Sequence, residues 1–257
     1  MSGEVPLPLA LVEGFAEVWS RLAGGTWERC ETSVGHLVIW TSPDGRREAL
    51  PDRMYGLVTS HLGELDPLTL PAGLSVNLPP GVSAEGAVLH AVGHQLTASD
   101  RESAWSSLRR VGRQGVLKAR RKGCRVRAVE AEDYLALASL KAERFGGEGP
   151  HPELVRTLRE IFGEEAVAIT GAVVDEEVAA AVLSLHVEGY GMLVDGASDR
   201  AHWDKNPNNL AVWSAVGALV DAGCGRIDYG FSEPGAGDLR FKDHMGGREV
   251  ALYRVGG

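Results

Sequence analysis

Apolar and polar residues alternate along the chain with two periods, one typical of helices and one typical of strands. In the first hundred residues, Leu11, Phe15, Val18 and Leu22 recur at helical spacing, and a glycine pair follows them. The segment 36–40 is instead almost continuously apolar, which is typical of a buried strand. The elements expected here are helices over 11–22 and 53–65, and strands over 36–40, 46–50, 73–78 and 87–97. They predict a small α+β domain over residues 1–100.

Residues 101–257 contain a longer series of elements. The residues 99–103 read Ser-Asp-Arg-Glu-Ser, which favours a domain boundary followed by a capped helix. Further along, three apolar segments follow one another across short polar turns, as neighbouring strands of one sheet do. The expected order is a basic helix from 103, a strand over 124–129, helices over 132–145 and 152–162, strands over 166–174, 178–187 and 190–195, a loop over 196–207, a helix from 208, and strands over 226–231 and 249–255. This order predicts an α/β fold (α+β, with a mixed sheet).

The segment 207–247 carries the most distinctive pattern. Asn208 or Asn209 is expected to cap a helix, because an Asn side chain accepts a hydrogen bond from an unpaired N–H of the first turn. That helix is expected to end at glycines, followed by a short strand and a glycine-rich loop without regular structure. Phe241 and Lys242 come after the loop, close to a further glycine pair. A lysine just past a strand end is where α/β proteins often place chemistry, and a surface lysine in a loop is an equally good interpretation.

This pattern resembles a known family. The run N-N-L-x-x-W, a helix, G-x-x-x-x-D-Y-G and F-K-x-x-x-G-G is similar to the last third of the Fem family. Its members are aminoacyl-tRNA-dependent peptidyltransferases and FemAB-like relatives, built on the acetyltransferase (GNAT) fold. The segment 105–108, leading into 118–126, is similar to the family's basic helix and the strand after it. The resemblance covers roughly residues 103–255, and implies a GNAT-like catalytic domain over 101–257 preceded by a smaller, degenerate GNAT-like half.

The resemblance also implies a reaction, in which an amine of a peptide or cell-wall precursor attacks the ester of an aminoacyl-tRNA and an amide forms. The tetrahedral oxyanion of such a reaction needs a cation or N–H donors. Lys242 resembles the family's lysine at the F-K position, which assigns it this role. An amine with a pKa of about 8 is partly neutral at pH 7, so a general base is optional; the candidates are Asp228 and His244. Substrate contacts are expected from Asn209, Trp213, Tyr229, Arg240, Phe241 and His202, with core packing as the alternative role of Trp213 and Tyr229.

Charge is distributed unevenly along the chain. The net charge of −9 disfavours a general nucleic-acid binder. Nine basic residues and no acidic one nevertheless lie in 109–127, which leaves about −18 on the remaining residues. This contrast favours a phosphate-rich partner over a merely solvated surface. The expected tRNA phosphate contacts are Arg109, Arg110, Arg113, Lys118, Arg120, Arg121, Lys122 and Arg125. Gly112 and Gly115 are expected to weaken the helix, so that part of this stretch becomes a loop.

The segment 196–207 bears on the acyl donor. Acetyl-CoA-dependent enzymes of the GNAT fold usually carry Q/R-x-x-G-x-G/A at this point, where backbone amides cradle the pyrophosphate. Here no glycine follows Ala197 in the segment, which counts against CoA. We therefore expect aminoacyl-tRNA as the donor and no cofactor. An acyl-CoA-dependent N-acyltransferase of the same fold is the alternative enzyme. A non-catalytic RNA-binding or scaffold protein is the alternative from another class.

The cysteines and the apolar runs indicate the compartment. Cys30, Cys124 and Cys224 are far apart and odd in number, which fits neither a disulfide framework nor a zinc site. His90 and His94 share one face of an expected strand without a third ligand nearby, so no metal site is expected. No signal peptide is evident, and no apolar run approaches the roughly 20 residues that a membrane span needs. These features predict a cytoplasmic protein.

Overall fold

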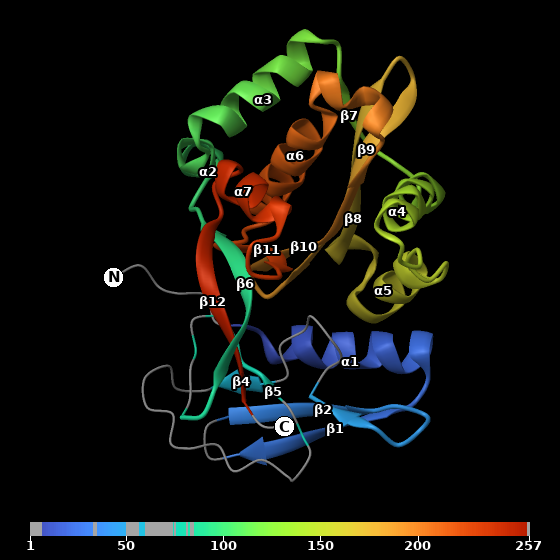
Figure 1. Ribbon diagram of the computed structural model, residues 1–257, viewed down its shortest axis with the longest axis vertical. Coiled ribbons are helices and arrows are strands. Elements are labelled where there is room, and N and C mark those ends of the chain that lie inside the picture. Colours follow the sequence, from blue (N-terminus) through green and yellow to red (C-terminus); the bar gives the residue numbers. More distant parts are fainter. Residues whose placement is uncertain are drawn as a thin grey trace. The chain divides into compact units, whose positions relative to one another are not determined.

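The computed structural model describes residues 7–32, 35–49, 57–59, 74, 76–80, 82 and 85–255. The chain divides into two compact units. The first is built mainly from His94–Gly230 and Gly237–Arg248, and the second from the described parts of Pro6–Gly93, Phe231–Ala236 and Glu249–Gly257. Figure 1 shows the course of the chain through its helices and strands.

The second unit contains the helix α1 (Leu9–Ala23) and a small antiparallel sheet. Its strands are β1 (Thr26–Thr32), β2 (Gly35–Thr41), β3 (Arg47–Glu48) and β4 (Leu57–Thr59), with β1, β3 and β4 all paired to β2. Leu11, Phe15 and Val18 of α1 are buried, as their helical spacing predicts. The helix 11–22, the strand 36–40 and its return strand are therefore confirmed, while β1 was not expected.

One prediction in this unit is wrong at the residues that the structure describes. A helix was expected over 53–65, but Leu57–Thr59 form a strand antiparallel to Gly35–Leu37 of β2. Pairing with an existing strand outweighs the weak helical spacing of this segment, because strand formation depends on the neighbouring strand more than on local preference. The remainder of the predicted helix lies outside the described residues. The strands expected at 73–78 and 87–97 correspond to β5 (Val76–Asn77) and β6 (Val88–Thr97).

The large sheet has the strand order β5-β12-β6-β11-β10-β9-β8-β7. The strands β7 to β11 lie in the first unit, which also receives the end of β6. Neighbours β7 to β10 are antiparallel, whereas β10 and β11 are parallel, so the sheet is mixed as the sequence predicts. The new strands are β7 (Arg125–Ala128), β8 (Val167–Val174), β9 (Glu177–Val187), β10 (Tyr190–Ser198), β11 (Arg226–Ser232) and β12 (Arg248–Val255).

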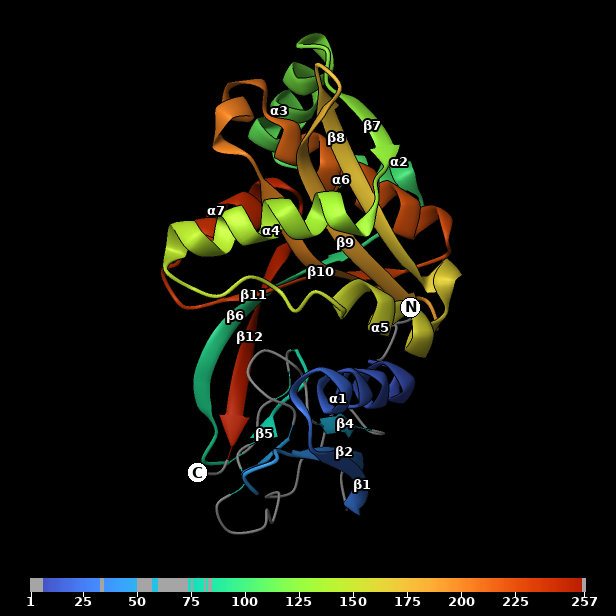
Figure 2. The same ribbon diagram turned by 90° about the vertical axis from the view of Figure 1, so that its right-hand side faces the viewer.

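Helices cover both faces of the sheet in the first unit. On one face α6 packs against β8, β9 and β10, with α2 and α3 outside it, and on the other face α4 and α5 pack against β8 to β10 (Figures 1 and 2). The helical elements are α2 (Arg101–Ser107), α3 (Arg110–Arg121), α4 (Ala131–Phe145), α5 (Leu154–Phe162), η1 (Glu164–Ala166), η2 (Arg200–Lys205), α6 (Pro207–Asp221) and α7 (Gly237–His244). The helix α6 contributes more residues to the core of this unit than any other element, and α3, β8 and β9 add small and branched residues to it. This layered arrangement of a mixed sheet establishes the predicted fold class.

Two local predictions need correction. The sequence predicted a loop over 231–237 and no helix after it, but the residues 237–244 form the helix α7. Neither Asn208 nor Asn209 caps α6, because the helix begins at Pro207 and its N-cap residue is Asn206, in the left-handed conformation without a side-chain cap bond. Proline is well suited to the first helical position, where its missing N–H costs no hydrogen bond. The capping of α2, in contrast, is confirmed, since Asp100 and Ser103 form a reciprocal capping box.

The glycines of the basic helix also act differently from the prediction. Gly112 and Gly115 lie inside the continuous helix α3 and are buried. A Cβ on Gly112 would lie 2.0 Å from the carbonyl oxygen of His244, and one on Gly115 would lie 2.6 Å from the amide nitrogen of Asn209. The two glycines therefore let α3 approach α6 and the end of α7 closely, and this packing compensates for their low helix preference.

Candidate active site

The candidate site begins where β10 and β11 stop pairing. Their parallel register covers Tyr190–Met192 opposite Arg226–Asp228, although both strands continue beyond it. At the same point, the register of β10 with β9 shifts between Leu193 and Asp195, which leaves Val194 as an extra, bulged residue. A bulge bends the strand and increases its twist, which turns β10 away from β11. Beyond Asp228, the backbone N–H and C=O groups of β10 and β11 therefore no longer pair with each other.

Asp228 is the centre of a buried hydrogen-bond network. Its side chain is fully buried, and the hydroxyl group of Tyr190 donates to Oδ2 over 2.8 Å. Nε2 of Gln95 donates to the same oxygen over 3.3 Å and to the Tyr190 hydroxyl oxygen over 3.1 Å. The backbone N–H of Gly230 donates to Oδ1 over 2.7 Å. Burial and the neighbouring carboxylate raise the pKa of Tyr190, which keeps its hydroxyl protonated as a donor. The network fastens β11 to β10 and to the end of β6.

Lys242 lies on α7 with a side chain that is 13% exposed. Its Nζ is 3.4 Å from Oδ2 of Asp238, one helical turn earlier. Burial lowers the pKa of Lys242, the Asp238 and Asp228 carboxylates oppose this effect, and the Lys141 ammonium group adds to it. The Lys242 ammonium group is therefore a poorly solvated cation within electrostatic range of Asp228 and of a second lysine.

That second lysine joins α4 to the bulged strand. Nζ of Lys141 donates to Oδ1 of Asp195 over 2.5 Å and to the carbonyl oxygen of Gly196 over 3.0 Å. The hydroxyl group of Tyr134 donates to Oδ2 of Asp195 over 3.1 Å, and burial followed by this carboxylate raises the pKa of Tyr134. The sequence analysis missed Lys141, Asp195 and Tyr134, and also Tyr190 and Gln95. Their only signal was Asp195, a carboxylate at the end of a strand beside the expected donor loop.

The other predicted catalytic and substrate residues lie at several places in the first unit. His244, the last residue of α7, is half-buried, and its carbonyl oxygen accepts a bond from the backbone N–H of Arg109 over 3.1 Å. Arg240 is exposed, while Phe241 is half-buried and packs against the core. His202 belongs to η2, where its Nε2 is 3.4 Å from Oε2 of Glu177. These assignments stay predictions.

Asn209, Trp213 and Tyr229 make structural contacts. Nδ2 of Asn209 donates to the sulfur of Met245 over 3.4 Å. Trp213 is buried, with its ring edge-on to Trp105 at a centroid separation of 4.9 Å. The hydroxyl group of Tyr229 donates to the carbonyl oxygen of Met245 over 2.9 Å, and burial raises its pKa. All three side chains support the positions of α6, β11 and the end of α7, and their expected substrate contacts stay predictions.

The predicted tRNA contacts lie on and beside α3. Arg109 pairs with Asp243 at 3.0 Å, Arg125 pairs with Glu176, and Arg113 donates to the carbonyl oxygen of Leu108. Within the described ranges, the other five of these basic residues form no ion pair: Arg110, Lys118, Arg120, Arg121 and Lys122. We call these five residues the α3 basic surface. Its guanidinium and ammonium groups keep their hydrogen-bond donors available for phosphate.

The segment between β10 and α6 uses its own backbone amides. The Asp199 side chain accepts from the backbone N–H of Ala201 over 2.9 Å, and the Asp199 carbonyl oxygen accepts from that of His202 over 3.3 Å. The N–H of Asn206 donates to the carbonyl oxygen of Trp203 over 3.1 Å. Pro207, the first residue of α6, has no N–H to offer. The backbone N–H groups of Ala201, His202 and Asn206 are therefore already used in internal hydrogen bonds, and Pro207 adds none.

Neither a metal cluster nor a membrane-spanning helix is found in the described part of the chain. No group of three or more His, Cys, Asp or Glu side chains there has the proximity that metal binding requires. No helix among those residues combines the length and the apolar character needed to cross a bilayer.

The fold and site define an acyltransferase domain, in which two parallel strands, one of them bulged, separate beside a buried lysine. The chain belongs to the acetyltransferase (GNAT) domain family, whose model matches residues 101–243, more than half of the sequence. The predicted membership of the GNAT superfamily is thereby confirmed. No curated protein matches the chain significantly.

Solved structures share the fold over almost the whole chain. FemX matches with a TM-score of 0.68 at 11% identity, covering 98% of this chain and 93% of that one. A conserved protein of unknown function from Bacteroides thetaiotaomicron matches with a TM-score of 0.58 at 10% identity, covering 94% and 89%. A tandem GNAT protein from the clavulanic acid biosynthesis pathway matches with a TM-score of 0.51 at 13% identity, covering 98% and 97%. At these identities the likeness is one of fold.

Proposed function

We propose that this protein is an aminoacyltransferase that moves an amino acid from aminoacyl-tRNA to an amine of a peptide or cell-wall precursor. The observation that carries the proposal concerns the backbone of the segment between β10 and α6. The N–H groups of Ala201, His202 and Asn206 already donate hydrogen bonds within this segment, and Pro207 has no N–H group. A pyrophosphate held by these amides before α6 is therefore disfavoured. The likeness of the fold to FemX over both chains' lengths supports the same choice of donor.

The chemistry is aminolysis of an ester. The acceptor amine attacks the aminoacyl carbonyl carbon, a C–N bond forms, and the C–O bond to the ribose breaks as the tetrahedral intermediate collapses. The ribose oxygen takes up the proton that the amine loses. The ammonium group of Lys242 stabilises the oxyanion, because a poorly solvated cation interacts more strongly with developing charge than one in water. Asp228 and His244 are the candidates for a base, and the α3 basic surface contacts the tRNA phosphates.

An acyl-CoA-dependent N-acyltransferase is the second candidate, because the family model is that of an acetyltransferase domain. A binding measurement separates the two. The purified protein is titrated with charged and uncharged tRNA, with CoA as competitor, at two salt concentrations. A salt-sensitive preference for charged tRNA that CoA does not affect supports the proposal. Binding of CoA without binding of tRNA would overturn the proposed donor.

Lys242 provides the test of catalysis. Replacing it by Ala should lower kcat by roughly 100- to 1,000-fold, the usual loss when one oxyanion-stabilising group is removed. Binding of charged tRNA should change little, because the phosphate contacts are elsewhere. Lys242→Arg retains the charge and should keep more activity than the alanine variant. Full activity of Lys242→Ala would leave the lysine without a catalytic role. Binding of tRNA without turnover, already in the natural protein, would instead favour a non-catalytic RNA-binding or scaffold protein.

A further inference from the structure

Two exposed aromatic rings lie together at the end of α4 and in η2. The side chain of Phe145 is the last of α4 and is 75% exposed, and that of Trp203 is 46% exposed. The guanidinium carbon of Arg144 is 5.1 Å from the centroid of each of these rings, and that of Arg200 is 5.2 Å from the Trp203 centroid. We call these four residues the aromatic-arginine cluster.

The charges of this cluster are not balanced by acidic groups. Among the residues that the structure describes, neither Arg144 nor Arg200 forms an ion pair, and Nε of Arg144 is buried without a hydrogen-bond partner. Other arginines of the same unit, such as Arg101 and Arg109, are paired with aspartates. In a protein with 35 acidic residues, two adjacent unpaired guanidinium groups favour an anionic occupant.

The orientation of the tryptophan ring is fixed. Nε1 of Trp203 donates to the hydroxyl oxygen of Ser198 over 3.0 Å, so the ring is anchored at its polar edge while nearly half of the side chain stays exposed. A held aromatic ring with flanking guanidinium planes is the chemistry by which proteins stack an unpaired nucleobase and bind its phosphate. Hydrophobic contact alone would not require the two cations.

The cluster also lies next to the candidate active site. Arg144 follows Lys141 by three residues on α4, and residues three apart lie on the same side of a helix. Lys141 binds Asp195 of the bulged strand, and its charge affects the pKa of Lys242. A nucleotide stacked on Trp203 would therefore lie beside the strand that leads to the reacting centre.

We propose that the aromatic-arginine cluster binds an unpaired adenine base of the donor substrate together with an adjoining phosphate. This inference rests on the proposed function, because it requires a donor substrate that carries a nucleotide. The unpaired 3′ end of a tRNA supplies such a base, and so does the adenosine of CoA. The RNA end is the favoured source, since the backbone N–H groups of Ala201, His202 and Asn206, beside Trp203, already donate to internal acceptors and are not available to a pyrophosphate.

The test uses equilibrium binding of the full chain to two probes, a short single-stranded RNA ending in C-C-A and CoA. The variants are Trp203→Ala, Phe145→Ala and Trp203→Phe, with Leu140→Ala as the control. Leu140 is on α4, is 53% exposed and is not part of the aromatic-arginine cluster. The alanine variants should weaken RNA binding roughly 5- to 150-fold, the usual contribution of one base stack. Trp203→Phe should retain most of the affinity, and Leu140→Ala should bind as the natural protein does.

The outcomes separate this site from the proposed donor. CoA binding that depends on Trp203 and Phe145, without RNA binding, supports the stacking site while the tRNA donor fails. Charged tRNA binding that neither alanine variant weakens supports the donor while the stacking site fails. A loss of self-association in Trp203→Ala, with binding of both probes unchanged, would also overturn the site and show that the cluster joins two copies of the chain. Phe145 is 75% exposed and Trp203 is 46% exposed, so circular dichroism should show the native fold in every variant.

Discussion

At the scale of single residues, the site is defined by how each charge is solvated. Asp228 is buried but accepts hydrogen bonds from Tyr190, Gln95 and Gly230, so its burial is compensated. Lys242 is in the opposite situation, because its pKa is lowered by burial despite two nearby carboxylates. A charge that is held at a cost in stability is typical of functional positions, where activity and stability compete.

A pH-dependent stability follows for Lys242. Its pKa in the folded protein is below the ordinary value of 10.5, so the unfolded chain binds more protons between these two pKa values. Below that range the buried ammonium group is charged in both states, and this lysine destabilises the fold. That destabilisation disappears as the pH rises through the folded pKa towards 10.5. Lys242→Met, which retains the length without the charge, should have a higher Tm than the natural protein at pH 7, and the gain should shrink by about pH 10. An equal gain at both pH values would show that the charge is not its cause.

At the scale of elements, α3 has two separate properties, one on each side. Its buried side carries Gly112 and Gly115, which meet α7 and α6, and its exposed side carries the α3 basic surface. The sequence showed the charge but not the reason for the glycines, because the partner atoms belong to residues about a hundred positions away. The packing of α3 against α6 and the end of α7 thus depends on the small size of its glycines. The expected binding of tRNA to α3 depends on the charge of its exposed side.

Replacing Gly112 by Ala tests the close approach. The new Cβ would lie 2.0 Å from the backbone oxygen of His244, which cannot rotate away, so α3 must shift from the end of α7. We expect a loss of about 1–3 kcal/mol in the free energy of unfolding, as for other overpacked sites. Gly147→Ala is the matched control, since its Cβ would have no neighbour closer than 4.0 Å. Urea unfolding measures both, and an unchanged midpoint for Gly112→Ala would contradict the packing argument.

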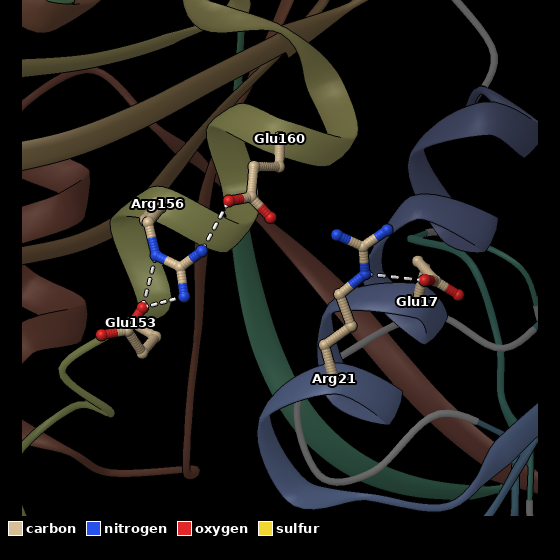
Figure 3. Close-up of polar contacts among 5 residues, drawn as sticks. All are labelled: Glu17, Arg21, Glu153, Arg156 and Glu160. Carbon is tan, nitrogen blue, oxygen red and sulfur yellow. Dashed lines mark hydrogen bonds and ion pairs between the residues drawn. The ribbon is translucent and has the colours of Figure 1, made fainter.

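The α3 basic surface predicts a local effect of charge. Replacing Arg120 and Arg121 by Gln should weaken tRNA binding and reduce its salt dependence, because fewer counterions are released from the phosphates. Arg21→Gln with Arg156→Gln removes the same total charge elsewhere. These two arginines are committed to acidic partners: Arg21 contacts Glu17 of α1, and Arg156 of α5 contacts Glu153 and Glu160 (Figure 3). Equal losses of affinity in both double variants would mean that only the net charge matters.

At the scale of the whole molecule, the first unit begins inside a strand. The end of β6 from His94 belongs to it, and Leu96 and Ala98 are part of its buried core. Gln95 reaches the Asp228 network, and the N–H of Ala98 donates to the carbonyl oxygen of Gly225 over 3.2 Å. We therefore propose that a catalytic domain needs these residues in addition to 101–257.

Two fragments test this boundary. A fragment of residues 101–257 lacks Gln95 and the buried residues of β6, so Asp228 and Tyr190 lose a hydrogen-bond partner inside the core. We expect it to unfold at a lower temperature than a fragment of residues 86–257, and by more than the few degrees that about 1 kcal/mol produces in a domain of this size. Equal thermal transitions in the two fragments would place the boundary at residue 101.

The order of elements in the second half of the chain could be predicted because it depends on local pattern. The helices 132–145 and 152–162 and the three strands after them have apolar residues at regular spacing, bounded by glycine, proline or charged turns. The helix α7 was missed, since its residues include a glycine and few apolar positions, and its stability comes from packing next to α3. The segment 53–65 failed for a related reason, because pairing with β2 decided the structure of Leu57–Thr59.

The sequence by itself determined the class of fold and the isolated basic stretch, since periodicity and charge can be read along one chain, and a family pattern in it led to the proposal of Lys242. Only the tertiary structure decided what surrounds that lysine. The Asp228 network, the Lys141–Asp195 pair and the aromatic-arginine cluster each join residues that are far apart in the sequence. Burial and hydrogen bonding depend on these neighbours in space, and no local pattern in the sequence specifies them.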